Sequence, residues 1–292
     1  MVRPSHFCVN PETADNAFQV TRTPASHALR LAAAAEHDQV VATLRDAGVQ
    51  VHVVEDTDAV TPDSTFVNNW ISTHPDGTIA VYPMSSPARR RERRSDIVDW
   101  LRRTYRVTRV LDYTAAEREC AFFEGTGALV IDHQTGTGFV GLSHRADRGL
   151  ARRVCADLGL DPVLVETADR HGRPIYHTNV WLSVGSGFVV WCPEVVDADA
   201  RDRLRRRFAE TGRDVVDITA DQMARFAGNV LEVSSLTGPV LAMSQAAFEA
   251  YTVEQRDVLS RHARIVAVGM PTLELSGGSM RCLLAGLHLR RR

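Results

Sequence analysis

Residues 128–158 read ALVIDHQTGTGFVGLSHRADRGLARRVCADL and contain the unit from which we infer the fold. Two apolar runs, 128–132 and 138–141, flank the turn sequence TGT at 135–137 and predict a β-hairpin. The stretch 148–158 follows and is expected to form a helix. The local unit is therefore a hairpin followed by a helix.

The same order recurs along the chain, so the unit is a repeat. The other copies are expected at 66–71, 78–82 and 89–103, at 179–184, 188–191 and 199–210, and at 230–233 and 240–243 with helical sequence to residue 262. The four copies are roughly 50–60 residues apart, a period long enough for a supersecondary unit. Because such a unit cannot bury its apolar face alone, we expect a closed or stacked array that forms one domain over residues 1–292.

The two ends of the chain are candidates for a fifth copy. A strand is expected at 4–9, a helix at 28–47 that ends at Gly48, and a strand at 49–54. Together with the C-terminal tail, these segments would complete a fifth α/β unit.

The composition excludes several kinds of chemistry. Of the 292 residues, 44% are hydrophobic and 24% are charged, and the net charge is -2. The sequence contains no lysine, so all 34 basic residues are arginine, which excludes a lysine Schiff base and a P-loop lysine. The five cysteines form no disulfide framework or CxxC metal pattern, and no apolar run reaches the ~18 residues of a membrane span. We therefore expect a cytoplasmic protein with free thiols, without metal, cofactor or membrane association.

Cys282 is the candidate nucleophile, and the repeat supplies partners for it. It follows a flexible Ser-Gly-Gly-Ser segment (276–279), where a ligand can approach the backbone closely. Glu124, His177 and Asp63 each lie at or just before the first strand of a hairpin. Taken singly, Cys282, Glu124 and His177 favour the simpler interpretations of a buried cysteine, a solvated turn glutamate and a histidine hydrogen-bonded at a strand edge. In a closed array, however, equivalent points lie at the same end and converge on the axis. There, a thiol and an imidazole fit covalent acyl-type chemistry on a carbon with a nitrogen leaving group.

Four motifs occur in order over most of the chain: DSTFV (63–67), EGTG (124–127), HTNV (177–180) and GGSMRC (277–282). They resemble the motifs of the guanidino-group-modifying superfamily, which includes arginine deiminase, dimethylarginine dimethylaminohydrolase and the amidinotransferases. Within it, the chain is most similar to the bacterial citrulline hydrolase (citrullinase) branch, through FQ (18–19), EGTG (124–127) and GNVLEV (228–233). The resemblance implies a five-bladed α/β propeller, or pentein, of ββαβ repeats.

The resemblance also implies a role for each matching residue of the reaction centre. Cys282 would be the nucleophile and His177 the general acid, then base. Glu124 would hydrogen-bond the planar nitrogen group of the substrate, and Asp63 lies where relatives help to hold the substrate.

Two arginines and two asparagines are further candidates for substrate binding. Arg89 and Arg145 resemble the arginines that bind a substrate carboxylate in the dimethylarginine hydrolases, and guanidinium groups bind carboxylates in bidentate geometry. The alternative for the Arg-rich run 89–94 is a solvated helix face or a nucleic-acid patch. Relatives that act on a guanidinium have acidic residues where this chain has Asn68 and Asn69. Because an amide both donates and accepts, it suits a neutral ureido group.

The predicted reaction is hydrolysis of the ureido group of citrulline to ornithine, ammonia and carbon dioxide through a covalent cysteine intermediate. The first alternative is the same chemistry on a guanidino substrate, by a hydrolase or an amidinotransferase, and the second is a non-catalytic propeller. The expected partner is a small amino-acid substrate rather than a nucleic acid or a membrane, and a homodimer is left open. The sequence also leaves open whether Arg281 acts on the neighbouring thiol or points away from it.

Overall fold

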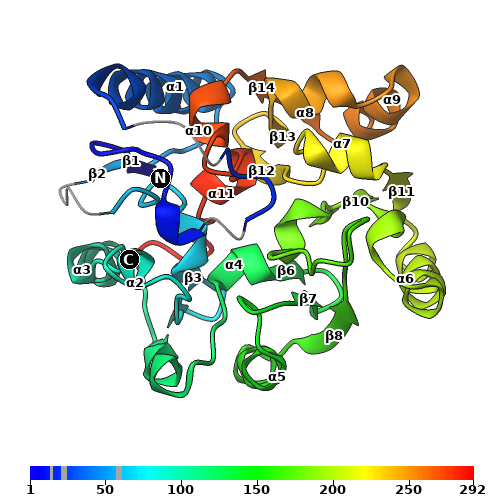
Figure 1. Ribbon diagram of the computed structural model, residues 1–292, viewed down its shortest axis with the longest axis horizontal. Coiled ribbons are helices and arrows are strands. Elements are labelled where there is room, and N and C mark those ends of the chain that lie inside the picture. The colour runs from blue at the N-terminus through cyan, green and yellow to red at the C-terminus, as the bar shows by residue number, and fades with distance from the viewer. Residues whose placement is uncertain (14–15, 21–24, 57–60) are drawn as a thin grey trace.

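Five small sheets are arranged around a central axis, with helices on the outside (Figure 1). The computed structural model describes residues 1–13, 16–20, 25–56 and 61–292. Four of the sheets have three strands each. In each of them the first two strands form an antiparallel hairpin, and the third strand pairs parallel with the second. The parallel pairing requires a crossover, which the outer helices provide, so the repeat is ββαβ and the fold is an α/β propeller.

The four complete units follow one another along the chain. Their strands are β3 (Ile71–Thr73), β4 (Thr78–Val81) and β5 (Arg109–Asp112); β6 (Leu129–Asp132), β7 (Thr137–Leu142) and β8 (Asp161–Glu166); β9 (Leu182–Val184), β10 (Phe188–Trp191) and β11 (Asp214–Asp217); and β12 (Leu231–Ser235), β13 (Gly238–Ser244) and β14 (Arg264–Val268). Their crossover helices are α2 (Pro87–Arg90) and α3 (Ser95–Thr104), α5 (Arg148–Asp157), α6 (Ala198–Glu210), and α8 (Gln245–Ala250) and α9 (Val253–Ser260). The shorter helices are α4 (Gly125–Ala128), α7 (Ala220–Ala224), α10 (Pro271–Glu274) and α11 (Met280–Leu283). The four predicted hairpins are confirmed, and helical segments follow each of them.

The start of the hairpins differs from the prediction in three of the four units. A single helical turn precedes the first strand at Val67–Asn69, at α4 and at Thr178–Val180, so β3, β6 and β9 are shorter than expected. These turns pack against one another at one end of the axis. A Cβ on Gly125, which has φ +48°, would lie 2.5 Å from the backbone oxygen of Asn68. The turns therefore bring the residues before each first strand into mutual contact.

The predicted helix at 89–103 is wrong as a single element, because two helices replace it. The short α2 is capped by Ser86, whose Oγ accepts a hydrogen bond from the Arg89 backbone N–H, and α3 begins at Ser95. The break lets Arg89 and Glu92 turn into the interior, where both are buried, while α3 packs separately on the outside of its sheet.

The fifth sheet is built by the N-terminal segment. β1 (Val2–Arg3) pairs parallel with β2 (Val54–Glu55), and α1 (His27–Asp46) connects them. As predicted, α1 ends before Gly48, which has φ +84°. The strands predicted at 4–9 and 49–54 are wrong, because the pairing is limited to two residues on each side.

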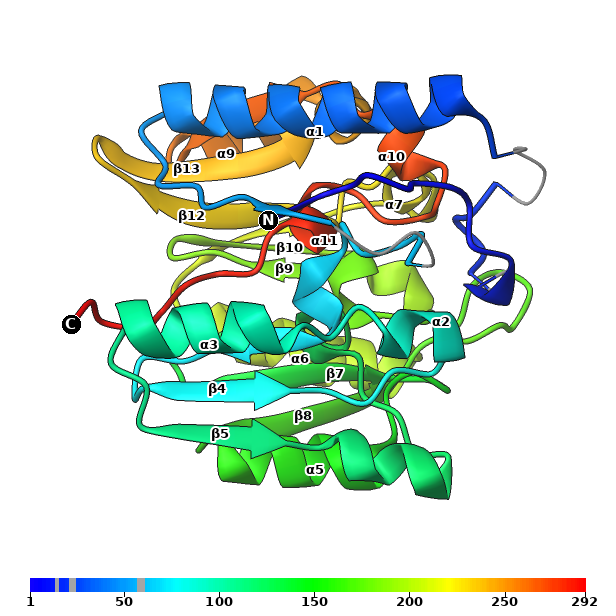
Figure 2. The same ribbon diagram turned by 90° about the vertical axis from the view of Figure 1, so that its left-hand side faces the viewer.

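The C-terminal tail was expected to complete this fifth unit, but the fifth sheet has only two strands in the part of the chain that is described. The tail instead lies against the first complete unit. Thr73 Oγ1 donates to the Gly286 carbonyl at 2.9 Å and accepts from the His288 N–H at 2.9 Å. Figure 2 shows the tail leaving α11 and running to the end of the molecule opposite α2.

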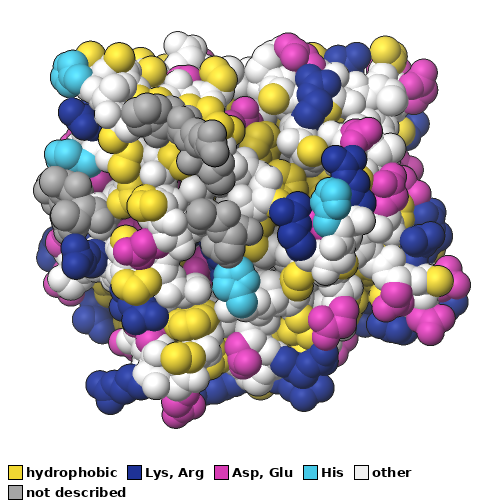
Figure 3. All heavy atoms as spheres, in the orientation of Figure 1, with side chains coloured by type: hydrophobic (Ala, Val, Ile, Leu, Met, Phe, Trp, Pro, Cys, Tyr) yellow, Lys and Arg dark blue, Asp and Glu magenta, His cyan; other side chains and the backbone are white. Residues whose placement is uncertain are grey.

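The core lies between each sheet and its outer helix. Leu44 of α1, Leu101 of α3, Val154 of α5 and Phe208 of α6 are buried in this layer. On the face in Figure 3, arginine and acidic side chains are interspersed. Among the described helices, none combines the length and the apolar character that crossing a bilayer requires. The helices thus bury their apolar faces against the outer side of the sheets.

Candidate active site

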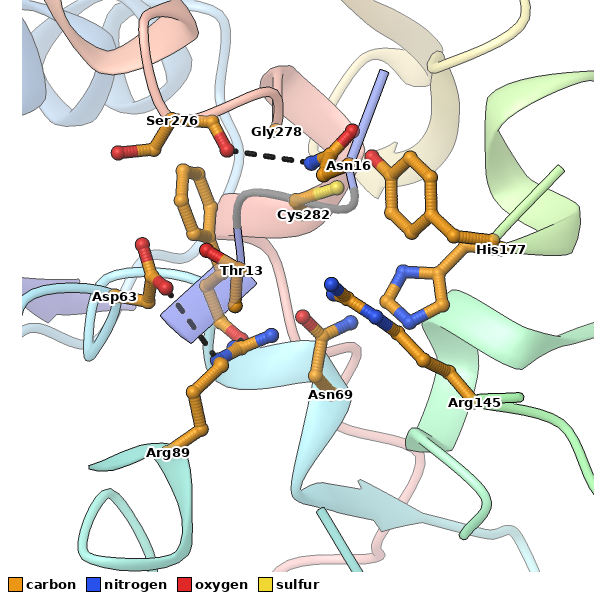
Figure 4. A pocket seen from close by; sticks show the side chains of 12 residues that line it. Thr13, Asn16, Asp63, Asn69, Arg89, Arg145, His177, Ser276, Gly278 and Cys282 are labelled. Atoms are coloured by element: carbon orange, nitrogen blue, oxygen red, sulfur yellow. Dashed lines mark hydrogen bonds and ion pairs between the residues drawn. The ribbon is translucent and has the colours of Figure 1, made fainter. Parts of the chain in front are cut away.

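A small pocket lies beside α11, where residues from distant parts of the chain converge (Figure 4). Six of the eight sequence-predicted site residues line it: Cys282, His177, Asp63, Asn69, Arg89 and Arg145. Thr13, Asn16, Phe66, Tyr176, Ser276 and Gly278 complete the lining. The volume is about 20 Å³, which is room for roughly one water molecule. An amino acid therefore enters only when some of these side chains move.

The Ser-Gly-Gly-Ser segment places Cys282 on α11 at the pocket wall. Gly277 has φ +78°, in the left-handed region that favours glycine. A Cβ on Gly278 would lie 2.6 Å from the Phe66 ring, so only glycine lets the chain pass so close to that ring. Ser279 then starts α11 and accepts a hydrogen bond from the Cys282 backbone N–H at 2.9 Å. The thiol is 3% exposed.

Two side-chain amides donate to the Cys282 sulfur. Asn229 Nδ2 lies 3.4 Å and Asn179 Nδ2 lies 3.6 Å from Sγ. The Asn229 amide is held in place, because Nδ2 also donates to the Asn179 carbonyl at 3.0 Å and Oδ1 accepts from the Arg281 N–H at 3.2 Å. Donors directed at sulfur can stabilise negative charge that develops on it during a reaction.

His177 is hydrogen-bonded to a buried carboxylate. Its Nε2 lies 2.8 Å from Glu124 Oε2, and both side chains are almost fully buried. A carboxylate only accepts, so Nε2 carries the hydrogen and Nδ1 holds the lone pair. Burial lowers the pKa of His177 to about 4, although Glu124 opposes the shift. The imidazole is therefore neutral at pH 7 and able to accept a proton at Nδ1.

Glu124 lies behind His177 and does not line the pocket. Its Oε1 accepts from the Ser85 backbone N–H at 3.1 Å, and Oε2 also lies 3.6 Å from Arg89 and 3.7 Å from Arg145. Burial raises the pKa of Glu124, but Arg145, His177 and Arg89 reverse this and hold the pKa well below its ordinary value. Glu124 is therefore ionised, and in this structure it contacts the histidine rather than the pocket.

Arg89 faces the pocket and is held rigidly by carboxylates. It is 3% exposed, so it does not belong to a solvated helix face. Nε and Nη2 donate to the two Glu92 oxygens at 2.9 and 3.0 Å, and Nε lies 3.8 Å from Asp63 Oδ2. Burial raises the pKa of Glu92 to about 8. It also raises the pKa of Asp63, and Arg89 opposes both shifts. One Asp63 oxygen accepts from Asn10 at 2.8 Å, and the other is buried without a hydrogen-bond partner among the described residues.

Arg145 reaches the same pocket from the second complete unit. Its guanidinium lies over the Tyr176 ring at 5.2 Å, and Nε donates to His144 at 3.1 Å. Tyr176 in turn donates to the Gly277 carbonyl at 2.7 Å. The pocket is thus lined by two guanidinium groups, each held by neighbouring side chains.

Of the two predicted asparagines, only Asn69 lines the pocket. Its Nδ2 donates to Asn68 Oδ1 at 3.0 Å, and Asn68 lies behind it, fully buried. A Cβ on Gly127 would lie 2.4 Å from Asn69 Nδ2 and 2.7 Å from His177 Nδ1. The Asn69 amide and the imidazole therefore meet across the Gly127 backbone.

The sequence reasoning missed several residues, and for one of them a signal existed. Asn229 lies just before the first strand of the hairpin in the last unit. The same position in the repeat indicated Asp63, Glu124 and His177. No spacing rule indicates Asn179 or Glu92, because their contacts depend on local turns. Within the described ranges, no cluster of three or more His, Cys, Asp or Glu side chains is arranged to hold a metal ion.

Comparison with known proteins gives a family match over almost the whole chain. The model of the family "N,N dimethylarginine dimethylhydrolase, eukaryotic" matches residues 3–289. No curated protein matches the chain at a significant level.

Solved structures share the fold. ArgZ, an arginine dihydrolase from the ornithine-ammonia cycle in cyanobacteria, superposes with a TM-score of 0.77 at 16% identity over 100% of this chain and 40% of that chain, so this chain spans less than half of that enzyme. The N-terminal domain of ArgZ has the same TM-score at 15% identity and is covered to 96%. A dimethylarginine dimethylaminohydrolase adduct has a TM-score of 0.65 at 14% identity, over 90% of this chain and 92% of that chain.

The TM-scores show that these proteins and this chain share a fold. It is the pentein α/β propeller of the guanidino-group-modifying superfamily. The match over residues 3–289 establishes the family. The chain therefore belongs to the N,N-dimethylarginine dimethylhydrolase family of the eukaryotic type.

Proposed function

We propose that this protein is a Cys-dependent C–N hydrolase that cleaves the ureido group of citrulline. Membership of the family supports cysteine-dependent chemistry on a planar carbon bonded to nitrogen. The observation that carries the proposal is the arrangement around one pocket of a thiol with two amide donors and an imidazole bound to a carboxylate.

In the first step, Cys282 Sγ forms a bond to the ureido carbon. The thiol proton passes to His177 Nδ1, and Glu124 stabilises the imidazolium through its hydrogen bond to Nε2. The imidazolium then protonates the nitrogen of the departing ornithine as the C–N bond breaks. A carbamoyl thioester on Cys282 remains, and His177 is neutral again.

In the second step, water attacks the thioester carbon. His177 takes one water proton and returns it to the departing Cys282 sulfur, so both residues regain their starting state. Carbamic acid, which keeps the other water proton, leaves and decomposes to ammonia and carbon dioxide. Because burial lowers the pKa of His177 to about 4, the resting imidazole is neutral and its Nδ1 lone pair is available for the thiol proton.

The pocket side chains favour an amino acid with a neutral reacting group. Asn69 presents an amide next to the imidazole, where a carbonyl oxygen or an NH₂ of a ureido group can be paired. Arg89 and Arg145 can bind the substrate carboxylate. Asp63 has one oxygen without a described partner, which can accept from a substrate N–H.

The second candidate substrate is a guanidino compound such as arginine or dimethylarginine. The family description and the arginine dihydrolase similarity favour it. The buried carboxylates Asp63, Glu92 and Glu124 near the pocket also tolerate a cation.

Product analysis separates the two candidates. Ammonia and ornithine are measured after incubation with citrulline, arginine, dimethylarginine or agmatine. We expect citrulline to give ornithine and ammonia with the highest kcat/KM. Faster turnover of arginine or dimethylarginine would contradict the ureido assignment but not the cysteine chemistry.

Two variants test the nucleophile. Cys282→Ala should bind substrate without turning it over, because the covalent step is lost. Cys120→Ala removes an exposed thiol outside the pocket and should retain full activity. Turnover by Cys282→Ala would remove the proposed mechanism.

The variant Asn69→Asp tests the ureido preference. A carboxylate beside the imidazole should lower kcat/KM for citrulline about tenfold or more and raise the ratio of arginine to citrulline turnover. Asn68→Asp is the matched control, because Asn68 does not line the pocket. An unchanged ratio in Asn69→Asp would show that this amide does not select the substrate.

A further inference from the structure

A second, larger cavity lies on the propeller axis on the other side of α11. Its volume is about 760 Å³. All five units contribute to its wall, through Val2, Ile71, Ile131, Val184 and Leu231. Arg281 lines this cavity, whereas Cys282 lines the candidate active site, so α11 separates the two spaces. The guanidinium of Arg281 therefore points away from the active-site pocket.

Arg281 is a buried cation with no carboxylate partner among the described residues. It is 7% exposed, and its Nε has no hydrogen-bond partner in the described part of the chain. Burial lowers the pKa of Arg281 to about 10, and the neighbouring Cys282 sulfur opposes the shift, so the guanidinium is still charged at neutral pH. A buried charge without a partner is unfavourable by several kcal/mol.

The other charged groups deep in this cavity are already paired. Arg213 forms a bidentate ion pair with Asp132 at 2.6 and 2.7 Å. Glu232 accepts from the Ser186 N–H and hydroxyl, both at 3.0 Å. Arg213 and Glu232 are thus held by groups of the protein, whereas the Arg281 guanidinium is left to face the cavity.

The cavity opens to solvent beside two histidines. His133 and His288 both line it and are exposed, and their ring centroids lie 4.6 Å apart. Burial lowers the pKa of His133, and the positive charge of Arg281 lowers it further. The guanidinium is therefore within electrostatic reach of that ring. An imidazole N–H can donate to an anion that has entered as far as Arg281.

We propose that this cavity is a binding site for a small organic anion whose carboxylate or phosphate group pairs with Arg281. His133 supplies a further donor, and the aliphatic side chains of the wall accommodate the remainder of the molecule. The site is separate from the candidate active site and does not depend on the proposed reaction.

Isothermal titration calorimetry tests the proposal with three probes, which are butanoate, inorganic phosphate and the neutral butanamide. We expect one binding site for butanoate or phosphate and no binding of butanamide, and the tighter of the two anions identifies the preferred head group. Arg281→Gln should weaken anion binding at least tenfold. Arg145→Gln, which alters the active-site pocket, should leave it unchanged.

Equal anion affinity in wild type and Arg281→Gln would mark an adventitious ion only and overturn the proposal. Loss of binding in Arg145→Gln, with full binding in Arg281→Gln, would assign the anion to the active site and also overturn it. Ala285→Phe provides a second variant, because Ala285 lines the cavity and a larger side chain fills it without removing the guanidinium. If anion affinity is unchanged in Ala285→Phe, the cavity is not the site.

Discussion

At the scale of single residues, the proposed nucleophile Cys282 receives hydrogen bonds from two other units of the propeller. Asn179 and Asn229 direct amide N–H groups at the sulfur, and Asn229 is held by backbone groups on either side. Such donors stabilise negative charge that develops on the sulfur as it reacts, since hydrogen bonds to charged groups are stronger. In the proposed reaction, the amides therefore lower the barrier to attack by the sulfur.

Replacing Asn179 by leucine keeps the side-chain volume similar but removes one donor. Alkylation of Cys282 by iodoacetamide at pH 7 should slow about tenfold, because a hydrogen bond to a charged group contributes roughly 1.5 kcal/mol or more. Peptide mass spectrometry follows the rate at Cys282. Exposed Cys120 in the same protein is the internal control and should react at the wild-type rate. An unchanged rate at Cys282 would show that the amide is only a packing group.

Gly127 is expected to be irreplaceable, because it separates Asn69 from His177. A Cβ there would lie 2.4 Å from one side chain and 2.7 Å from the other. Gly127→Ala should therefore displace the imidazole and lower kcat/KM about 100-fold. Gly269→Ala is the matched control, because a Cβ at Gly269 meets nothing within 4 Å. Comparable activity of the two variants would mean that the imidazole position is not critical.

At the scale of elements, the one-turn helices before β3, β6 and β9 decide which side chains reach the pocket. A strand would alternate its side chains between the two faces of the sheet. A helical turn instead lets neighbours such as Asn68 and Asn69 take different places, one behind the pocket and one in it. The reaction centre is thus built from turns, and the sheets support them.

The helix α1 carries a buried histidine whose protonation changes the free energy of unfolding. His37 is fully buried, and burial lowers its pKa to about 4. Because the folded-state pKa lies below the unfolded value of about 6.5, the unfolded state binds the proton first. The stabilisation is present above pH 6.5 and is lost progressively as the pH falls from about 6.5 to about 4.

His37→Leu removes this titration. Between pH 7 and pH 4.5, the free energy of unfolding should fall by about 2 kcal/mol less in the variant than in wild type. Urea unfolding of both proteins at both pH values measures this difference between variant and wild type. The contributions of all other titrating groups cancel in it. Parallel losses in the two proteins would contradict a neutral His37 in the folded state.

At the scale of the whole molecule, a buried ion pair joins two neighbouring units. Arg213, directly before β11, pairs with Asp132 at the end of β6, and both side chains are 3% exposed. Arg207 and Asp161 join the same two units at 2.6 Å, but these side chains are 36% and 62% exposed. The two pairs thus differ mainly in burial.

Asp132→Ala should lower the free energy of unfolding by roughly 3 kcal/mol or more, because it leaves Arg213 buried and unpaired. Asp161→Ala should cost less than about 1 kcal/mol, since water screens an exposed pair. The double variant Asp132→Leu with Arg213→Met should recover most of the loss. Urea unfolding measures all three, and equal losses in the two single variants would contradict the role of burial.

The repeat, the order of the hairpins and six residues of the pocket lining could be predicted from sequence. Apolar runs and glycine turns act over a few residues, so they indicate strands, turns and helices without knowledge of the fold. Position within the repeat predicted that Glu124 and His177 lie at the same end of the array, and the structure has them hydrogen-bonded, with Cys282 at the same pocket as His177. The extent of the fifth unit was not predictable, because β1 and β2 pair over only two residues each.

Only the tertiary structure decided which polar side chains meet. Asn179 and Asn229 reach the sulfur across 103 and 53 residues of sequence, and Arg89 turns inward from an arginine-rich run that reads as exposed. Arg281 and Cys282 are adjacent in sequence, yet they line separate cavities. The physical reason is that local patterns determine the elements, whereas closure of the five units around the axis determines the distances between side chains from different elements.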